Sequence, residues 1–223
     1  MATPMTAYRD RTVGDIAARL AGATALFRNH KIDFCCGGDV PLAEAAARGG
    51  LDLADLEAAL GALAATPPDA PPDSATLADH ILIRFHETHR RELPELVTLA
   101  RRVEAVHRDH REAPHGLADL LERAAAELED HMSKEEQILF PAMQADYRGS
   151  LDMPIRVMRL EHDGHAQTIH AIEELAHNFA APADACRSWQ ALYTGAEKFV
   201  ADLREHIHLE NNVLFPRFER RWS

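Results

Sequence analysis

The sequence predicts an all-α protein in which a small helical domain precedes an antiparallel four-helix bundle. Hydrophobic residues make up 46% of the 223 residues, and only 11 glycines and 12 prolines are present, which suits a helical domain with a sizeable core. Apolar residues after the first third recur at alternating steps of three and four, the spacing of a helix bundle. A proline-rich run separates the two parts. We therefore expect a helical domain over residues 1–66, a linker over 67–75 and a bundle over 76–223.

The first domain is expected to contain four short helices. Thr12-Val-Gly-Asp15 is typical of a helix N-cap, and Leu26-Phe27 marks a second short helix. Pro41 suits the first turn of a third helix, which Gly49-Gly50 ends. Asp52 can cap a fourth helix that runs to about residue 65. The linker that follows has four prolines, so we expect it to be stiff.

Four long helices are expected in the bundle. Their predicted ranges are about Thr76–His107 and Pro114–Gln144, followed by helices that start near Pro154 and near Ala185. Pro94 is expected to kink the first of them. The predicted core positions include Leu82, Leu93, Leu117, Leu128, Ile138, Ala142, Ile155, Phe179, Phe199 and Val213.

Two histidine patterns occur twice in the bundle. The stretch His131–Pro141 contains His-x-x-x-Glu and ends in Leu-Phe-Pro, and the stretch His206–Pro216 repeats both features 75 positions later. Likewise His86-Glu-Thr-His89 returns as His162-Asp-Gly-His165. A histidine and a glutamate four residues apart lie on one face of a helix. A repeated two-helix unit of this kind is typical of a metal site built from both copies.

The predicted ligands interrupt otherwise apolar helix faces at one depth of the bundle. Burying a carboxylate costs several kcal/mol unless it is paired or bound, and two converging carboxylates would repel each other. Two metal ions would remove both costs, each receiving two nitrogens and two oxygens if both carboxylates bridge. An oxo or hydroxo bridge would add a fifth donor, and mixed nitrogen and oxygen ligands with open positions suit iron or manganese. The predicted ligands are His86, His131, Glu135, His162, His206 and Glu210.

Other polar residues lie close to these ligands along the chain. Glu127 lies one turn before His131, and Glu161 directly precedes His162. Both are candidates for a proton path or an access route, and a solvated surface acid is the alternative for each. His89 and His165 are expected in the core or in support of the ligands. The remaining histidines have no such pattern and are expected on the surface: His80, His107, His110, His115, His170, His177 and His208.

Cys35 and Cys36 are adjacent and precede two glycines. A disulfide between neighbours would be strained, so we interpret them as an accessible thiol pair for redox chemistry, nitrosyl chemistry or transfer of a metal. If a helix began here, its N-terminus would lower the thiol pKa. Two small buried apolar residues are the alternative. Cys186 is expected to be structural.

The net charge of −12 argues against nucleic acid or an anionic membrane as a partner. No apolar run approaches a membrane span, and the N-terminus lacks the apolar segment of a signal peptide. We therefore expect a cytoplasmic protein with free thiols. The sequence leaves open whether it is a monomer or a homodimer.

Four segments together resemble the RIC family (repair of iron centres; YtfE/ScdA/DnrN-type proteins). They are Tyr8-Arg-Asp10, Asp33-Phe-Cys-Cys-Gly-Gly38, Glu135-Glu-Gln-Ile-Leu-Phe-Pro141 and Leu209-Glu-Asn-Asn-Val-Leu-Phe-Pro216. The resemblance covers essentially the whole chain. It implies a short cysteine domain joined to a hemerythrin-like di-iron bundle, with the six predicted ligands holding two iron ions and both glutamates bridging. It also implies a role in recovering iron–sulfur clusters damaged by nitric oxide or peroxide.

Three functions compete at this stage. The protein could supply iron to damaged or apo iron–sulfur proteins. It could instead reduce nitric oxide to nitrous oxide at two ferrous ions, as an enzyme. It could also bind oxygen or nitric oxide as a sensor, although no domain that would receive such a signal is evident in the sequence.

Overall fold

The computed structural model describes residues 8–63, 71, 73–145 and 149–219. Within these residues the regular elements are all helices, with one isolated β-bridge between Thr12 and Pro41, so the all-α prediction is confirmed. The chain divides into two compact units. One consists of Met1–Leu77 together with Arg204–Ser223, and the other is Ala78–Leu203. The domain boundaries expected from the sequence stay a prediction, and most of the expected linker lies outside the described residues.

Two of the four short helices of the N-terminal segment begin where their capping residues predict. Thr12 accepts a hydrogen bond from the backbone N–H of Asp15, and Asp52 accepts from two backbone N–H groups at the start of the fourth helix, which satisfies donors that a helix leaves open. Pro41 is the N-cap of the third helix rather than a residue of its first turn. The helices are α1 (Val13–Arg19), α2 (Ala23–Asn29), α3 (Leu42–Gly49) and α4 (Leu53–Ala62).

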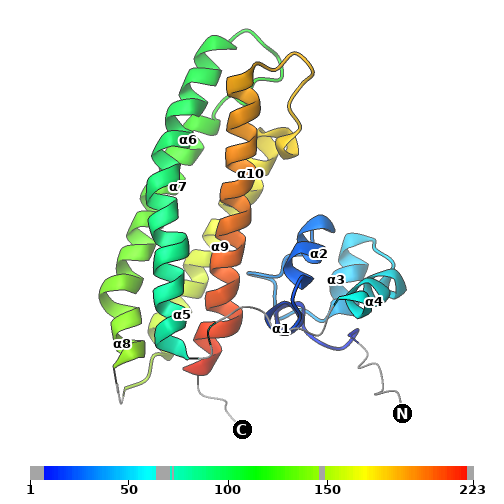
Figure 1. Ribbon diagram of the computed structural model, residues 1–223, viewed down its shortest axis with the longest axis vertical. Coiled ribbons are helices and arrows are strands. Elements are labelled where there is room, and N and C mark those ends of the chain that lie inside the picture. Colours follow the sequence, from blue (N-terminus) through cyan, green and yellow to red (C-terminus); the bar gives the residue numbers. More distant parts are fainter. Residues whose placement is uncertain (1–7, 64–70, 72, 146–148, 220–223) are drawn as a thin grey trace. The chain divides into compact units, whose positions relative to one another are not determined.

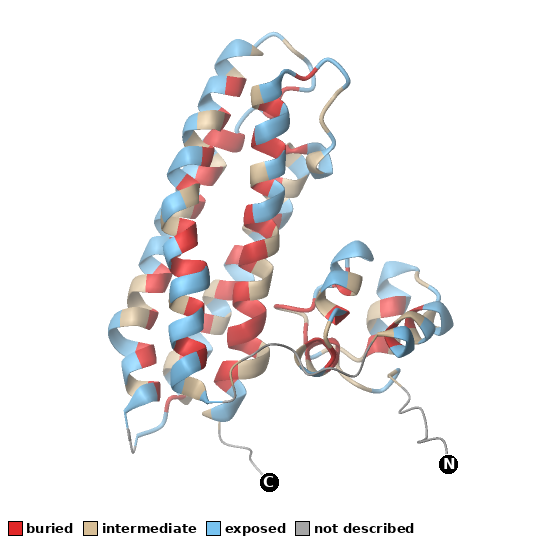
Figure 2. Cartoon of the chain, in the orientation of Figure 1, coloured by how far each residue is buried: buried red, intermediate tan, exposed pale blue. Residues whose placement is uncertain are grey.

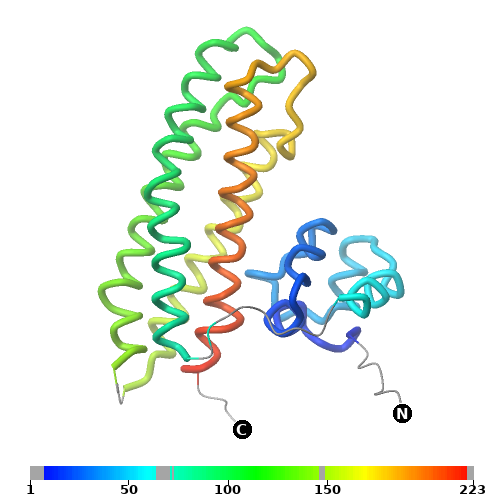
Figure 3. The backbone as a smooth tube through the Cα atoms, viewed as in Figure 1, coloured from blue at the N-terminus to red at the C-terminus, as the bar shows by residue number. Residues whose placement is uncertain are grey.

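The bundle contains four long helical runs, and Figures 1 and 3 show that they alternate in direction along the chain. The third run ends at Leu175, four residues before Phe179, which was predicted to lie in the core. The first run is α5 (Ser74–Ile81), η1 (Leu82–His86) and α6 (Glu87–Val106), and the second is α7 (Leu117–Lys134), η2 (Glu135–Leu139) and α8 (Phe140–Gln144). The third is α9 (Asp152–Leu175), followed by the 3₁₀ turn η3 (His177–Phe179), and the fourth is α10 (Arg187–His208), η4 (Leu209–Leu214) and η5 (Phe215–Arg217).

Three of these runs contain a π-helical segment at a predicted ligand, which the sequence did not predict. The segments η1, η2 and η4 are π-helices, and such segments are frequent at functional sites. In each, the backbone N–H after the segment bonds to a carbonyl five residues earlier. Pro141 and Pro216 each lie two residues after the last residue of one of these segments, η2 and η4. Because proline has no N–H, an ordinary i→i−4 bond is lost at both places.

Each π-helical segment moves the buried face by one residue. Ile138, predicted in the core, is 64% exposed, whereas Leu139 and Phe140 are buried. Figure 2 shows the buried positions as red turns on the inner faces of the long helices. The predictions therefore need correction beyond each π-helical segment, because a five-residue step replaces the expected step of three or four. The same step leaves Leu82 and Val213 only half-buried, and Ile81, Leu214 and Phe215 are buried in their place.

This shift predicts a large loss of stability for one substitution and a small one for its neighbour. Leu139→Ala is expected to lower the free energy of unfolding by about 2–5 kcal/mol, because it removes a fully buried side chain. Ile138→Ala is expected to change it by less than about 0.5 kcal/mol, as for other exposed positions. Urea titration of both variants tests this. A larger loss of unfolding free energy for Ile138→Ala than for Leu139→Ala would contradict the π-helical register.

A charged cluster joins the first and fourth runs within the bundle unit. Asp202 accepts from Arg84 Nη2 at 2.7 Å and from Lys198 Nζ at 2.9 Å. Burial alone would raise the pKa of the Asp202 carboxyl, but the hydrogen bonds from Arg84 and Lys198 outweigh it and lower that pKa. A carboxyl with a lowered folded pKa adds stability above its unfolded pKa, and this stability is lost as the pH falls through the folded value.

We therefore expect a pH-dependent cost for Asp202→Asn. At pH 7 the substitution should lower the free energy of unfolding by about 1–2 kcal/mol, a modest figure because both cationic partners are half exposed to solvent. The difference from wild type should shrink as the pH falls below about 4, where the carboxyl of the unfolded chain is also protonated. Chemical denaturation at several pH values measures it, with the exposed Asp119→Asn as control. A cost that is independent of pH would reject the charge-based explanation.

Candidate metal centre

The structure brings the six predicted ligands together in two groups of four. The first group contains His86 and His206, the second contains His131 and His162, and both groups contain Glu135 and Glu210. Within each group one donor atom per residue lies within 4.8 Å of every other. All six side chains are buried.

Glu135 offers one oxygen to each group. Its Oε2 lies 3.5 Å from His86 Nε2, and its Oε1 lies 3.4 Å from His131 Nε2. On the fourth run, His206 Nε2 lies 3.1 Å from Glu210 Oε1. His131 Nε2 and His162 Nε2 are also 3.1 Å apart. Ring nitrogens this close, facing carboxylate oxygens in a buried space, fit the donor set of metal ions such as iron or manganese.

A second layer of charged residues supports two of these histidines. His86 Nδ1 lies 2.8 Å from Glu136 Oε1, and Glu136 in turn accepts from Arg90 at 2.7 Å. The same arrangement recurs where His131 Nδ1 lies 2.9 Å from Glu161 Oε2 and Lys134 lies 2.8 Å from the other oxygen. A carboxylate on the outer ring nitrogen orients a ligating histidine.

These contacts set the charge state of both carboxylates. Burial alone would raise the pKa of Glu136, but hydrogen bonds from Arg90 and His86 lower it below its usual value. The pKa of Glu161 is lowered in the same way, because Lys134 and His131 outweigh the effect of burial. Both carboxyls therefore ionise more readily than burial alone would allow. Sequence reasoning selected Glu161 but missed Glu136, whose only signal was its place beside Glu135.

The remaining residues selected from the bundle sequence lie in different surroundings. Glu127 is exposed, so its place in a proton path stays a prediction. His89 and His165 are buried, as expected. The ring of His89 packs edge-on against Phe199, with centroids 5.5 Å apart, and His165 packs edge-on against His131. The ring of Phe140 stacks on that of His86, with the centroids 5.7 Å apart.

The cysteine pair lies in a loop that Asp33 organises. Asp33 accepts hydrogen bonds from the backbone N–H groups of Cys35, Cys36 and Gly37, and no helix begins at these residues. Cys35 is buried and Cys36 is half-buried. A hydrogen bond with Cys36, burial and the nearby Asp33 charge raise the pKa of the Cys35 thiol well above its usual value. The expectation of a lowered pKa at a helix start therefore does not hold for Cys35.

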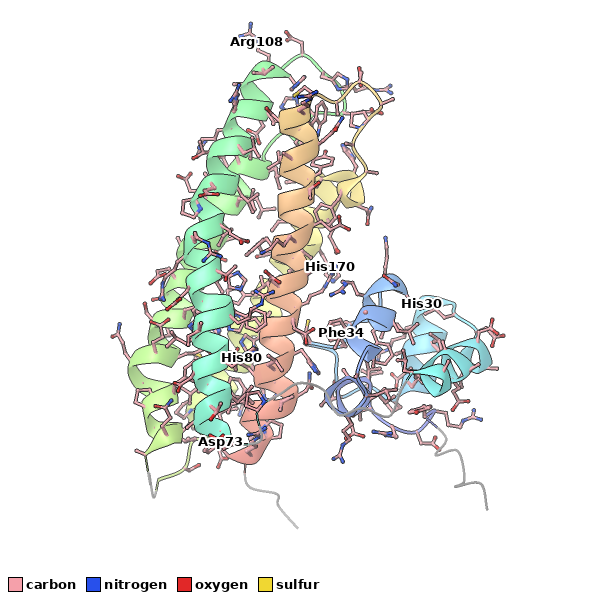
Figure 4. All side chains as sticks on the ribbon, in the orientation of Figure 1. His30, Phe34, Asp73, His80, Arg108 and His170 are labelled. Atoms are coloured by element: carbon pink, nitrogen blue, oxygen red, sulfur yellow. The ribbon has the colours of Figure 1, made fainter. Side chains whose placement is uncertain are left out.

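The turns after Glu210 hold this loop within the first unit. Asn211 Nδ2 donates to the carbonyl of Cys35 at 3.0 Å, and Asn212 Nδ2 donates to that of Phe34 at 2.9 Å. The ring of Phe34, labelled in Figure 4, meets His208 edge-on at 5.5 Å. His208 was expected on the surface but is buried, and burial lowers its pKa to about 4. Its partner is far away in the sequence, so its own helix pattern could not reveal the contact. By contrast, His80 and His170 are exposed, as expected.

Comparison with known proteins agrees with this architecture. The model of the hemerythrin HHE cation binding domain matches residues 77–218, and that of ScdA_N, a domain of unknown function, matches residues 9–64. A protein of Pectobacterium carotovorum named iron-sulfur cluster repair protein YtfE is 47% identical, over 95% of this chain and 97% of its own length. One of the same name from Musicola paradisiaca is 48% identical over 94% and 96%. A probable iron-sulfur cluster repair protein of Haemophilus influenzae is 44% identical over 94% and 97%.

The helical bundle, with its buried histidines and glutamates, defines a metal-binding protein of the hemerythrin HHE class with an N-terminal cysteine domain. More closely, the chain belongs to the YtfE family of iron–sulfur cluster repair proteins. The resemblance noted in the sequence is thereby confirmed. Among the described residues, none of the helices combines the length and the apolar character needed to cross a membrane.

Proposed function

We propose that this chain holds two iron ions and supplies iron for the repair of iron–sulfur clusters in other proteins. The observation that carries the proposal is the pair of four-residue groups that share Glu135 and Glu210. Each group offers two imidazole nitrogens and two carboxylate oxygens, a set that suits ferrous or ferric iron. The names of the relatives, which describe iron–sulfur cluster repair, support the same role.

The donor set also supports iron as a cargo. Histidine and carboxylate ligands must be deprotonated to bind a metal, so the affinity falls when they gain protons. Unlike a closed site of four thiolates, this set consists of imidazoles and carboxylates, which release a metal when they gain protons. The recipients would be iron–sulfur proteins that have lost iron, and the small ligands would be nitric oxide or oxygen.

Transfer to an apo protein tests the proposal directly. The iron-loaded protein is mixed without oxygen with an inactive apo iron–sulfur enzyme, a thiol reductant and a sulfide source, and enzyme activity and protein-bound iron are followed. We expect reactivation together with a matching loss of iron from the donor. In a parallel sample, the reduced protein is exposed to nitric oxide. Many turnovers of nitrous oxide formation, without any reactivation, would reject iron supply in favour of a nitric oxide reductase.

The cysteine pair gives a second, separable prediction. Replacing both Cys35 and Cys36 with alanine is expected to leave bound iron unchanged, because neither thiol belongs to the two groups of bundle ligands. Delivery to the apo enzyme should slow at least about tenfold, the loss typical when a metal-handling residue outside the ligand set is removed. The exposed Cys186→Ala serves as control and should transfer iron at the wild-type rate. Loss of iron from the double variant would contradict the separation of holding and delivery.

A further inference from the structure

A chain of charged residues runs from His86 to the surface of the bundle. Glu136 Oε1 lies 2.8 Å from His86 Nδ1 and 2.7 Å from Arg90 Nη1. Arg90 also donates through Nε and Nη2 to both oxygens of Glu129, at 2.7 and 3.0 Å. His86 is fully buried. The single oxygen of Glu136 is thus shared between a buried ring and a fixed guanidinium.

This geometry determines which nitrogen of His86 faces the proposed iron site. Glu136 Oε1 accepts from the guanidinium of Arg90, which can only donate, and the same oxygen faces His86 Nδ1, so the Nδ1 of His86 carries the hydrogen. The lone pair is then on Nε2, the atom that faces Glu135 Oε2 at 3.5 Å. A carboxylate on Nδ1 also makes the imidazole a stronger donor to a metal. Arg90 offsets part of that effect, because it draws charge from the same oxygen.

We propose that Glu136 is a positioning residue for the iron site: it holds His86 in the Nε2-donating form and, with Arg90, sets how strongly His86 donates. The proposal rests on the proposed function, because it requires iron at the group that contains His86. It assigns Glu136 to one of the two ions only, since His86 belongs to one group and is absent from the other.

The repeat in the sequence makes this assignment specific. The position that corresponds to Glu136 in the second copy is Asn211, which follows Glu210. Asn211 donates to the carbonyl of Cys35. The two copies therefore keep the ligand but have different neighbours, so Glu136 is not explained as part of the repeated ligand pattern.

The simplest competing explanation is an ion pair that only joins two helices. A matched control exists in the same pair of helices, where Arg101 on α6 contacts Glu122 on α7. Glu122→Gln breaks that pair far along the helices from the ligands. Glu136→Ala removes the contact with His86, and Glu136→Gln keeps an oxygen acceptor but removes the charge.

The test compares these three variants with wild type as full-length proteins. Ferrous iron affinity is measured by competition with a chelator, the reduction potential by titration of the iron-loaded protein, and the thermal midpoint on the iron-free protein. For Glu136→Ala we expect one of the two ions to bind about 10- to 100-fold more weakly. Glu136→Gln should recover most of that affinity, with a more positive reduction potential because the histidine donates less strongly. Glu122→Gln should leave both iron measurements at wild-type values.

The outcomes separate this inference from the proposed function. If wild type binds two ions and Glu136→Ala binds both with wild-type affinity and potential, Glu136 is an interhelix ion pair and the inference is overturned. Equal falls in the iron-free thermal midpoint for Glu136→Ala and Glu122→Gln would accompany that result. If wild type itself binds no iron, the proposed function fails first, whatever the variants do.

Discussion

Glu135→Gln is expected to abolish binding of both proposed iron ions. Glu135 is the only ligand of the second run that belongs to both groups, and its two oxygens face different histidines. A glutamine offers one weak oxygen donor and no charge. The affinity for each ion should therefore fall by more than about 100-fold, beyond the loss caused by removing a supporting residue.

The matched control is His86→Gln, which removes a ligand of only one group. That variant should lose one ion and keep the other, measured as iron per chain after gel filtration in ferrous buffer. The iron-free Glu135→Gln protein should be at least as stable as wild type, because the substitution removes a fully buried charge. Loss of iron without loss of stability excludes unfolding as the cause. Equal iron contents in the two variants would show that the carboxylate is not shared.

The meeting of the six proposed ligands could be predicted from the sequence because buried charge is so costly. Six polar side chains occupied helix positions that should be apolar, and two of them were carboxylates at the same depth. Surface residues with no common role would not be expected to form the same His-x-x-x-Glu pattern twice. The pattern specified which residues meet, although it gave no information about the backbone that brings them together.

The π-helical segments were not predictable, because a five-residue step has no signature in composition. In the second run the expected and observed core positions agree up to Glu135, and beyond it they differ by one residue, so that Leu139 replaces Ile138. A proline lies two residues after each of η2 and η4. Its physical effect is consistent with a helix that has lost one ordinary hydrogen bond and remains helical with wider spacing.

The supporting carboxylates show a different limit of sequence reasoning. Glu136 acts on a histidine of another helix and is held by Arg90, which also belongs to that helix. Such contacts depend on how two helices are rotated against each other, which periodicity alone does not fix. Glu161 was selected because it adjoins His162, but the histidine that it contacts is His131. Proximity in sequence thus identified Glu161 but not the histidine that it contacts.

Removal of iron is expected to destabilise the protein strongly. A ligand present at about 1,000 times its dissociation constant stabilises the folded state by about 4 kcal/mol. For a chain of this size, about 2–4 °C of thermal midpoint corresponds to each kcal/mol, so chelation should lower the midpoint by about 10 °C. Scanning calorimetry of the loaded and chelated protein measures the shift.

The part of the bundle that loses stability when iron is removed is as informative as the size of the loss. Without iron, Glu135 and Glu210 still lie in one buried group with their donor atoms within 4.8 Å, and two buried carboxylates at that separation repel each other. The π-helical segments that contain them, η2 and η4, should therefore open before the distant turns around Val103 and Leu117. Hydrogen exchange should rise first in η2 and η4, by at least about tenfold for each 1.4 kcal/mol of local stability lost. A uniform rise along all helices would mean that iron stabilises the bundle only globally, and that the shared carboxylates are not the source of strain.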